Sequence, residues 1–155
     1  MSGVARIRAL ATQDLSAFNL DLEGMQVAAI TVDGDEATWQ RDGGELTIIP
    51  SRALLDGAEF ATVVRYAGVP ETINDLFGVS GFLHTDDGTV VAGEPHVAAT
   101  WYPVNDHPTD QAAYTFHITV PRGLEAVANG VLVGKRTDGD WTTWTWRAAS
   151  RWRRT

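Results

Sequence analysis

Alternation of apolar and polar residues is the feature that most constrains this chain. It recurs in short segments of strand length, such as residues 18–22 and 113–120, and no segment keeps an apolar repeat of helical period. Turn signals such as Asp33-Gly34 and Asp86-Asp87-Gly88 separate these segments about every 8–12 residues. Because glycine tolerates the backbone of tight hairpin turns, these signals mark strand reversals. The pattern predicts an all-β fold of antiparallel sheets.

The expected strands follow one another along most of the chain. They cover residues 18–22, 26–32, 45–49, 60–66, 81–85, 89–92, 113–120, 126–136 and 141–147. A further apolar, aromatic strand is expected over residues 98–102, and the least regular stretches, 68–78 and 102–111, are expected to be long loops. No linker or low-complexity segment interrupts residues 3–146, so a single all-β domain is predicted there.

Charge and composition exclude several classes of partner. The chain has 20 acidic and 12 basic residues, a net charge of −8, whereas a general nucleic-acid binder needs a basic face. It has no cysteine, so no disulfide or thiolate site is expected. No apolar run approaches the roughly 18 residues of a membrane span, and no signal-peptide core opens the chain. We therefore expect a cytoplasmic protein without a membrane or nucleic-acid partner.

The last nine residues, 147–155, differ from the rest in charge. They hold four arginines and no acidic residue. A short basic end of this kind is typically solvated and frayed, and we predict a basic tail over this range.

No set of residues in the chain has the pattern of a catalytic or metal site. No two histidines stand three to five positions apart, and the motifs H-E-x-x-H, G-x-S-x-G and G-x-x-x-x-G-K-[ST] are absent. Most carboxylates lie in turn sequences, where they bond backbone amides. We expect no catalytic residue, no metal ligand and no cofactor in this chain.

Three tryptophans stand close together at Trp141, Trp144 and Trp146. In a strand, Trp144 and Trp146 share one face and Trp141 takes the other. A stacking platform for sugar rings and an ordinary packing contact are both open interpretations.

The most informative stretch covers residues 94–108. Trp101, Tyr102 and Pro103 end an apolar run, and Asp106 and Pro108 then suit a tight turn, the aspartate by accepting backbone amides. These five residues predict a rigid corner between two strands.

This corner, followed by Ala113-Tyr114-Thr115-Phe116 and a strand that ends in Pro121, resembles the aminopeptidase N family of zinc metallopeptidases. The non-catalytic N-terminal domain of that family carries a corner of this kind. Residues 11–15, Thr31-Val32-Asp33-Gly34 and Ala128-Asn129-Gly130 resemble the same domain. The resemblance covers about residues 3–146 and is greatest to actinobacterial members. It implies curved antiparallel sheets in a saddle that resembles a β-sandwich.

The resemblance also implies a function and partners. In the family this domain packs on a thermolysin-like domain that carries the zinc, and together they remove N-terminal amino acids from peptides. The motifs of that catalytic domain are absent, so this chain is expected to be inactive alone. Its implied partners are the catalytic domain and, in a complete enzyme, the peptide substrate. The family uses a residue twelve positions before the corner aspartate to hold the substrate's free α-amino group, and Glu94 occupies that position.

Both ends depart from the family. Relatives have strand sequence ahead of the match at residues 11–15, and a missing first strand would leave a sheet edge open. The expectation is then a homodimer through that edge. Near the other end, relatives continue with Pro-Met-Ala-Thr-Tyr-Leu, and one choice of codons for residues 150–155 yields Pro-Met-Ala-Thr-Tyr in a shifted frame. Residues 147–155 are accordingly interpreted as a frameshift product at a truncated gene.

Two other functions stay open on the sequence alone. One is a free-standing β-sandwich module that binds carbohydrate or protein through its tryptophans. The other is an autonomous hydrolase with an unrecognised site, for which no catalytic residues can be named.

Overall fold

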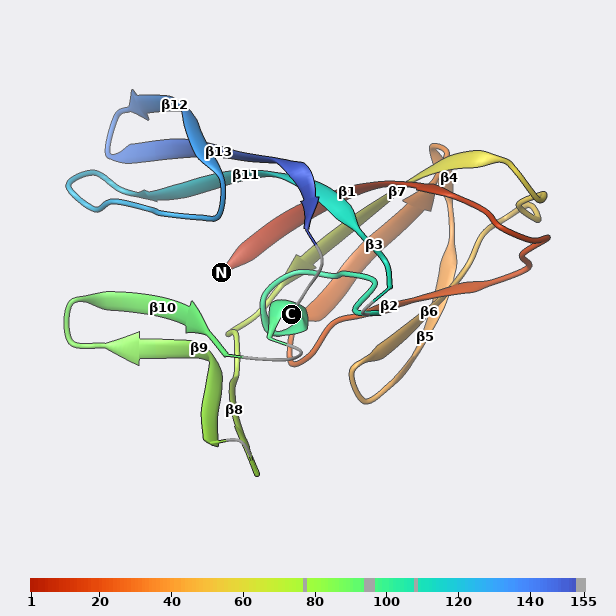
Figure 1. Ribbon diagram of the computed structural model, residues 1–155, viewed down its shortest axis with the longest axis horizontal. Helices are drawn as coiled ribbons and strands as arrows, with labels where there is room; N and C mark the ends of the chain where they lie inside the picture. Colours follow the sequence, from red (N-terminus) through yellow and green to blue (C-terminus); the bar gives the residue numbers. More distant parts are fainter. Residues whose placement is uncertain (77, 94–96, 108, 153–155) are drawn as a thin grey trace. The chain divides into compact units, whose positions relative to one another are not determined.

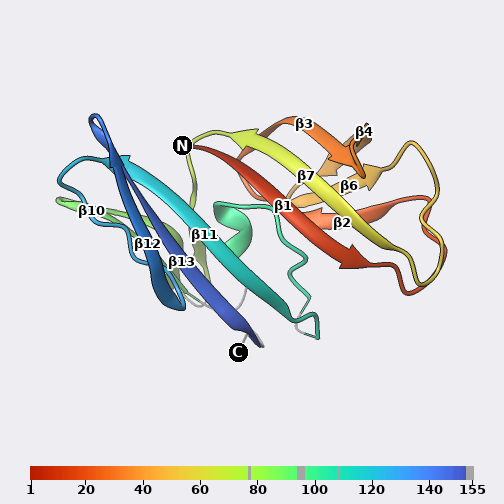
Figure 2. The ribbon, with the colours of Figure 1, turned by 90° about the horizontal axis from the view of Figure 1, so that it is seen from above.

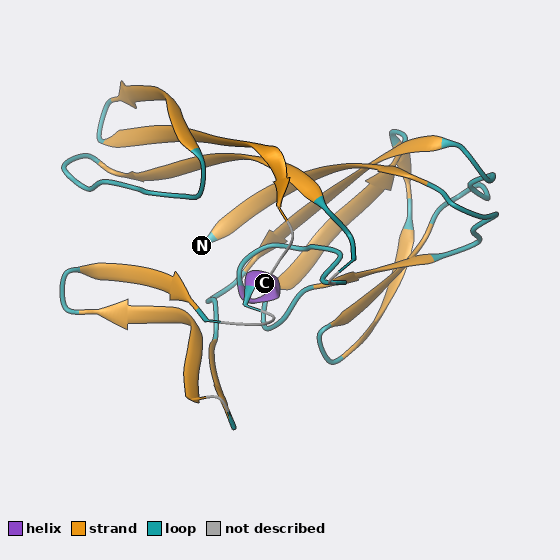
Figure 3. Ribbon diagram, in the orientation of Figure 1, coloured by secondary structure: helices purple, strands orange, loops and turns teal. Residues whose placement is uncertain are grey.

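The computed structural model describes residues 1–76, 78–93, 97–107 and 109–152. It is 61% strand and 2% helix, and every sheet is antiparallel, which confirms the predicted all-β class (Figure 3). The chain divides into two compact units, Met1–Asp106 and His107–Thr155, which are described separately below. The single domain over residues 3–146 stays a prediction.

The first unit contains three sheets (Figure 1). A four-stranded sheet has the order β1-β7-β3-β4, and three-stranded sheets have the orders β2-β6-β5 and β10-β9-β8. The strands are β1 (Ser2–Leu10), β2 (Phe18–Asp21), β3 (Gln26–Val32), β4 (Asp35–Glu36), β5 (Thr38–Asp42), β6 (Glu45–Ile49), β7 (Glu59–Ala67), β8 (Thr72–Asp75), β9 (Gly78–Thr85) and β10 (Gly88–Ala92).

Strand β1 was not among the expected strands. It pairs with β7 over nine residue pairs, from Ser2 opposite Ala67 to Leu10 opposite Glu59 (Figure 2). Strand β1 precedes residues 11–15 and is the edge strand of the sheet β1-β7-β3-β4, so the homodimer through a sheet edge stays a prediction.

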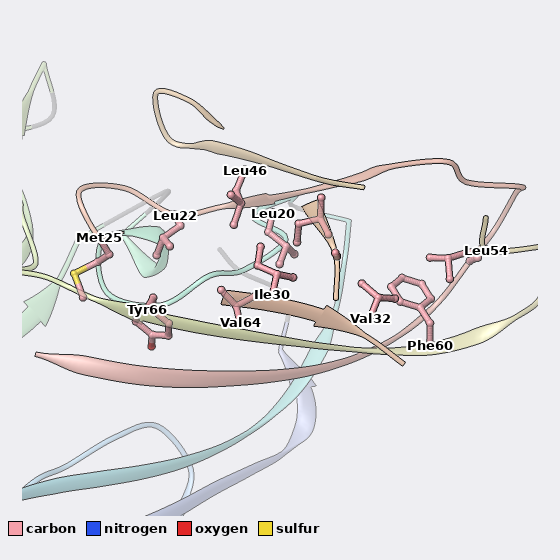
Figure 4. Packing of buried hydrophobic residues seen from close by; sticks show 13 residues of the cluster. Leu20, Leu22, Met25, Ile30, Val32, Leu46, Leu54, Phe60, Val64 and Tyr66 are labelled. Atoms are coloured by element: carbon pink, nitrogen blue, oxygen red, sulfur yellow. The ribbon is translucent and has the colours of Figure 1, made fainter. Parts of the chain in front are cut away.

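The core of this unit lies between the sheets β1-β7-β3-β4 and β2-β6-β5 (Figure 4). Leu22, Leu46 and Val64 are fully buried in it. Burial also raises the pKa of Tyr66 to about 12, because the phenolate form loses its hydration. The Tyr66 ring lies so close to Gly3 that a Cβ there would be 2.4 Å from ring carbon Cζ.

The turn at Asp33-Gly34 is the predicted two-residue hairpin loop. Asp33 has φ 51° and Gly34 has φ 91°, the left-handed backbone that this kind of tight turn requires. The loop joins Val32 to Asp35, which face each other across β3 and β4. Asp33 also accepts a hydrogen bond from the Ala61 amide at Oδ1, 2.8 Å away, so the turn is fastened to β7.

Residues 68–78 contain a strand where a loop was expected. Strand β8 pairs with β9 from Thr72 opposite Gly81 to Asp75 opposite Gly78. The expectation of a loop along this whole stretch is therefore wrong. The polar sequence Thr-Ile-Asn-Asp carries little alternation, so its pairing depends on the neighbouring strand.

The second unit is a three-stranded sheet with the order β11-β13-β12. Its strands are β11 (Ala112–Pro121), β12 (Val131–Asp138) and β13 (Trp141–Trp152). Because β13 continues to Trp152, which lies opposite Ala112, the expectation of a frayed end is wrong for residues 147–152. No helix in the described part of the chain is long and apolar enough to cross a membrane.

Candidate functional site

The corner predicted over residues 101–108 is fastened to the end of β2 by backbone hydrogen bonds. The Asp21 amide donates to the Val104 carbonyl at 2.7 Å, and the Val104 amide donates back to the Asp21 carbonyl at 3.1 Å. Asp21 also accepts a hydrogen bond at Oδ2 from the Asp106 amide, at 2.8 Å. Just beyond β2, the Glu23 amide donates to the Ala99 carbonyl at 2.8 Å. The corner is thus held from both sides by one short segment.

The run before the corner is a turn of 3₁₀ helix, η1 (Ala98–Thr100), and the expected strand over residues 98–102 is wrong. Thr100 is fully buried, and its hydroxyl donates to the Val97 carbonyl at 2.6 Å. The amides of the two residues after η1 both donate to the Ala98 carbonyl at 3.2 Å. These bonds satisfy the polar backbone of a buried turn without a neighbouring strand.

Aromatic and proline side chains fill the corner. The rings of Trp101 and Tyr102 meet edge to face with centroids 4.7 Å apart, and Tyr102 also packs against the main core. Pro103 and Val104 are buried behind them. The fifth predicted corner residue, Pro108, lies outside the described residues. Packing against the core fixes the corner as firmly as its hydrogen bonds do.

Arg41 stabilises the backbone that holds the corner. Its guanidinium donates to the carbonyls of Leu22 and Met25, and its Nε donates to the Gly43 carbonyl at 3.0 Å. One side chain of β5 therefore satisfies three carbonyls around the segment that follows β2. No sequence pattern singled out Arg41, and the sole signal is its position one residue before a hairpin turn.

Glu94 lies outside the described residues, but the residues on either side of residues 94–96 are placed. Gly93 ends the segment after β10 with φ 134°, a conformation that favours glycine. A Cβ at Gly93 would lie 2.4 Å from the Ser80 Cβ and 2.8 Å from Val97 Cγ1. Gly93 is therefore packed closely against β9 and against the residue that leads into η1.

The tryptophans of β13 do not form one platform. Trp144 is buried, and the ammonium of Lys135 lies 4.1 Å from its ring centroid. Trp146 is half-buried and donates its indole N–H to the Ala126 carbonyl at 2.9 Å. Trp141 takes the other face and is 54% exposed. Of Trp141, Trp144 and Trp146, only Trp141 offers a mostly exposed ring to a sugar.

Of the described histidines, His84 lies in β9, His107 in the segment before β11 and His117 in β11. Within the described ranges, no group of three or more His, Cys, Asp or Glu residues is arranged to hold a metal ion. His96 lies outside the described residues. The remaining rings contact Phe82 (from His84, centroids 5.6 Å apart), Thr109 (from His107, 2.8 Å) and Thr145 (from His117, 3.0 Å).

Comparisons with solved structures identify proteins of similar fold. No family model and no curated protein matches the chain. Among solved structures, it is similar to the M1 zinc metallopeptidase from Deinococcus radiodurans, with a TM-score of 0.90 and 28% identity. It is equally similar in fold to a variant of a two-domain M1 zinc metallopeptidase bound to L-arginine, at TM-score 0.90 and 29% identity. Both matches cover 97% of this chain but 35% of the other chain.

A more distant neighbour extends the fold likeness. The aminopeptidase A of Legionella pneumophila, in complex with aspartic acid, matches 94% of this chain and 17% of its own, at TM-score 0.78 and 18% identity. The predicted resemblance to the aminopeptidase N family is confirmed, since these structural neighbours are M1 zinc metallopeptidases. The chain spans about a third of the length of the first two.

Proposed function

We propose that this chain is the N-terminal, non-catalytic domain of an aminopeptidase N-like zinc metallopeptidase and is inactive without the catalytic domain. The observation that carries the proposal is the match of nearly the whole chain to about a third of two such metallopeptidases. The proposed partners are therefore the zinc-bearing domain and, in a complete enzyme, a peptide with a free N-terminus.

The described residues of this chain do not fit a zinc site. A catalytic zinc takes three protein ligands and leaves a fourth position open for water. The described residues offer no such group, and we assign the ion to the proposed partner, the catalytic domain. When bound there, zinc would polarise the peptide carbonyl and activate water.

Glu94 is the residue that we propose to reach the substrate. A carboxylate pairs with an ammonium group through short, charge-assisted hydrogen bonds, and so selects peptides with a free N-terminus. Support comes from its neighbours, because Gly93 is packed against Ser80 and Val97 leads into the buried turn η1. A charged anchor is useful only if the backbone that carries it is fixed, since a small displacement weakens the pairing.

A chimera tests this proposal. In it, the present chain replaces the matching third of the Deinococcus metallopeptidase, and hydrolysis of aminoacyl chromogenic substrates is measured with zinc. We expect the chimera to be active and Glu94→Ala to raise KM about 10- to 100-fold, the effect of one charge-assisted hydrogen bond. Glu94→Gln should retain part of the affinity, because an amide oxygen still accepts from the ammonium.

The matched control is Glu36→Ala, which removes an exposed carboxylate of β4 and should leave KM unchanged. A chimera that is folded and fully loaded with zinc but inactive would contradict the domain assignment. An active chimera whose KM does not respond to Glu94→Ala would contradict the anchor role alone.

A further inference from the structure

The turn sequence Ala128-Asn129-Gly130 lies in the segment between β11 and β12, outside every strand (Figure 1). It contains the one Asn-Gly pair of the whole sequence. Asn129 is exposed, and its carboxamide makes no hydrogen bond to another described residue. The pair is therefore open to water, and no strand ladder fixes the asparagine.

The glycine of this pair is required by the fold. Gly130 has φ 104°, a conformation that favours glycine. A Cβ at this position would lie 2.2 Å from the carbonyl oxygen of Arg147 and 2.7 Å from the amide nitrogen of Ala148. Both atoms belong to the backbone of β13, so no side chain fits there. Because glycine has no side chain, its amide nitrogen is the least shielded that can follow an asparagine.

We propose that Asn129 is a site of spontaneous deamidation in the folded chain, with the Gly130 amide as nucleophile. The Gly130 nitrogen attacks Cγ of Asn129. The N–Cγ bond forms, the Cγ–Nδ2 bond breaks, and ammonia leaves with the proton of the Gly130 amide. Water then opens the cyclic succinimide at either carbonyl. One product is aspartate, and the other is isoaspartate, in which the main chain runs through Cβ and Cγ.

Isoaspartate adds one backbone atom to a segment that is fixed at both ends. On one side, the Trp146 indole donates to the carbonyl of the buried Ala126 at 2.9 Å. On the other side, Val131 lies opposite Arg147 at the start of β12. Residues 127–130 alone separate these two anchors, so we expect the extra atom to loosen the first pairs of β12 with β13.

The test incubates the full chain at mildly alkaline pH and follows its peptides by mass spectrometry. Isoaspartate is identified by enzymatic methylation of its carboxylate. Asn19 is the internal control, because it lies in β2 and donates its carboxamide to Glu45. We expect Asn129 to deamidate at least about tenfold faster than Asn19, and within about tenfold of its rate in a peptide of residues 126–132.

Two variants separate the added charge from the added backbone atom. Asn129→Gln cannot close the same ring and should not deamidate at this position on the same timescale. Freshly prepared Asn129→Asp carries the new charge on an ordinary backbone. Amide hydrogen exchange of residues 131–134 should be on the order of tenfold faster in the isoaspartate form than in the fresh chain, and unchanged in Asn129→Asp.

The proposal is overturned if the folded chain deamidates at Asn129 no faster than at Asn19, or if no isoaspartate forms there. Its consequence for β12 is overturned if the isoaspartate form and Asn129→Asp exchange residues 131–134 at the same rate. This inference does not depend on the proposed function.

Discussion

At the scale of single residues, Arg41 has the clearest predicted effect. Arg41→Ala leaves the carbonyls of Leu22 and Met25 without their donor, and we expect the free energy of unfolding to fall by about 1–2 kcal/mol. Arg52→Ala is the matched control, because its ion pair with Asp35 is exposed and should contribute less than about 0.5 kcal/mol. Urea unfolding of both variants measures the difference, and equal losses would contradict the bracing role of Arg41.

The role of a single residue can be predicted from the sequence when that role depends on its neighbours along the chain. Asp33 and Gly34 were predictable, because the turn requires a left-handed backbone that aspartate and glycine tolerate. Arg41 was not, because two of its three acceptors stand 16 and 19 residues away and come near only in the folded chain. Pattern alone could not distinguish Arg41 from any other exposed arginine.

At the scale of elements, the close packing after β10 can be tested with two glycines. Gly93→Ala places a Cβ 2.4 Å from Ser80 at a positive φ, so we expect a loss of about 1–3 kcal/mol in the free energy of unfolding. Gly88→Ala at the start of β10 meets no atom within 4 Å and should change it by less than about 0.5 kcal/mol. Thermal unfolding of the two variants measures both changes in stability.

A double variant separates the two causes of that loss. Ser80→Gly removes the nearest atom but not the positive φ, so it should restore part of the stability of Gly93→Ala. If Gly93→Ala is as stable as Gly88→Ala, the packing described for this segment is wrong.

The strands that the sequence predicted are those with strong apolar alternation or β-branched residues. Residues 26–32 and 45–49 match β3 and β6 in full. Strand β1 was missed because Gly3, Ala5 and Ala9 give its inner face little hydrophobic contrast. Residues 98–102 were predicted as a strand because the run is apolar and aromatic, but the amides of residues 100–102 bond to carbonyls within the turn. Whether this segment forms a strand or a turn depends on contacts with the end of β2, which is far from it in the sequence.

At the scale of the whole molecule, the short coverage of its structural neighbours predicts how the chain behaves alone. With added zinc it should release no chromophore from aminoacyl p-nitroanilides, because it spans only about a third of the length of the metallopeptidases it matches. The full-length Deinococcus metallopeptidase is the positive control. Turnover that co-purifies with this chain and is abolished by a zinc chelator would contradict the proposed division of labour.

The fold class could be predicted from alternation, and the likeness to metallopeptidases from the corner at Trp101, Tyr102 and Pro103. The role of Glu94 could not be derived from this chain alone. When a site is formed by residues of two domains, the distances between those residues exist only in the assembled protein. One domain by itself therefore does not define the chemistry of the site.

The pairing of β1 with β7 has a consequence for the order of events during synthesis. Ser2 faces Ala67, so β1 leaves the ribosome well before its partner β7 and must wait for it. The hairpin of β5 and β6, joined by two glycines, needs no such delay. The nascent chain therefore passes through a period in which local hairpins exist while β1 is still unpaired, and that period ends as residues 59–67 emerge.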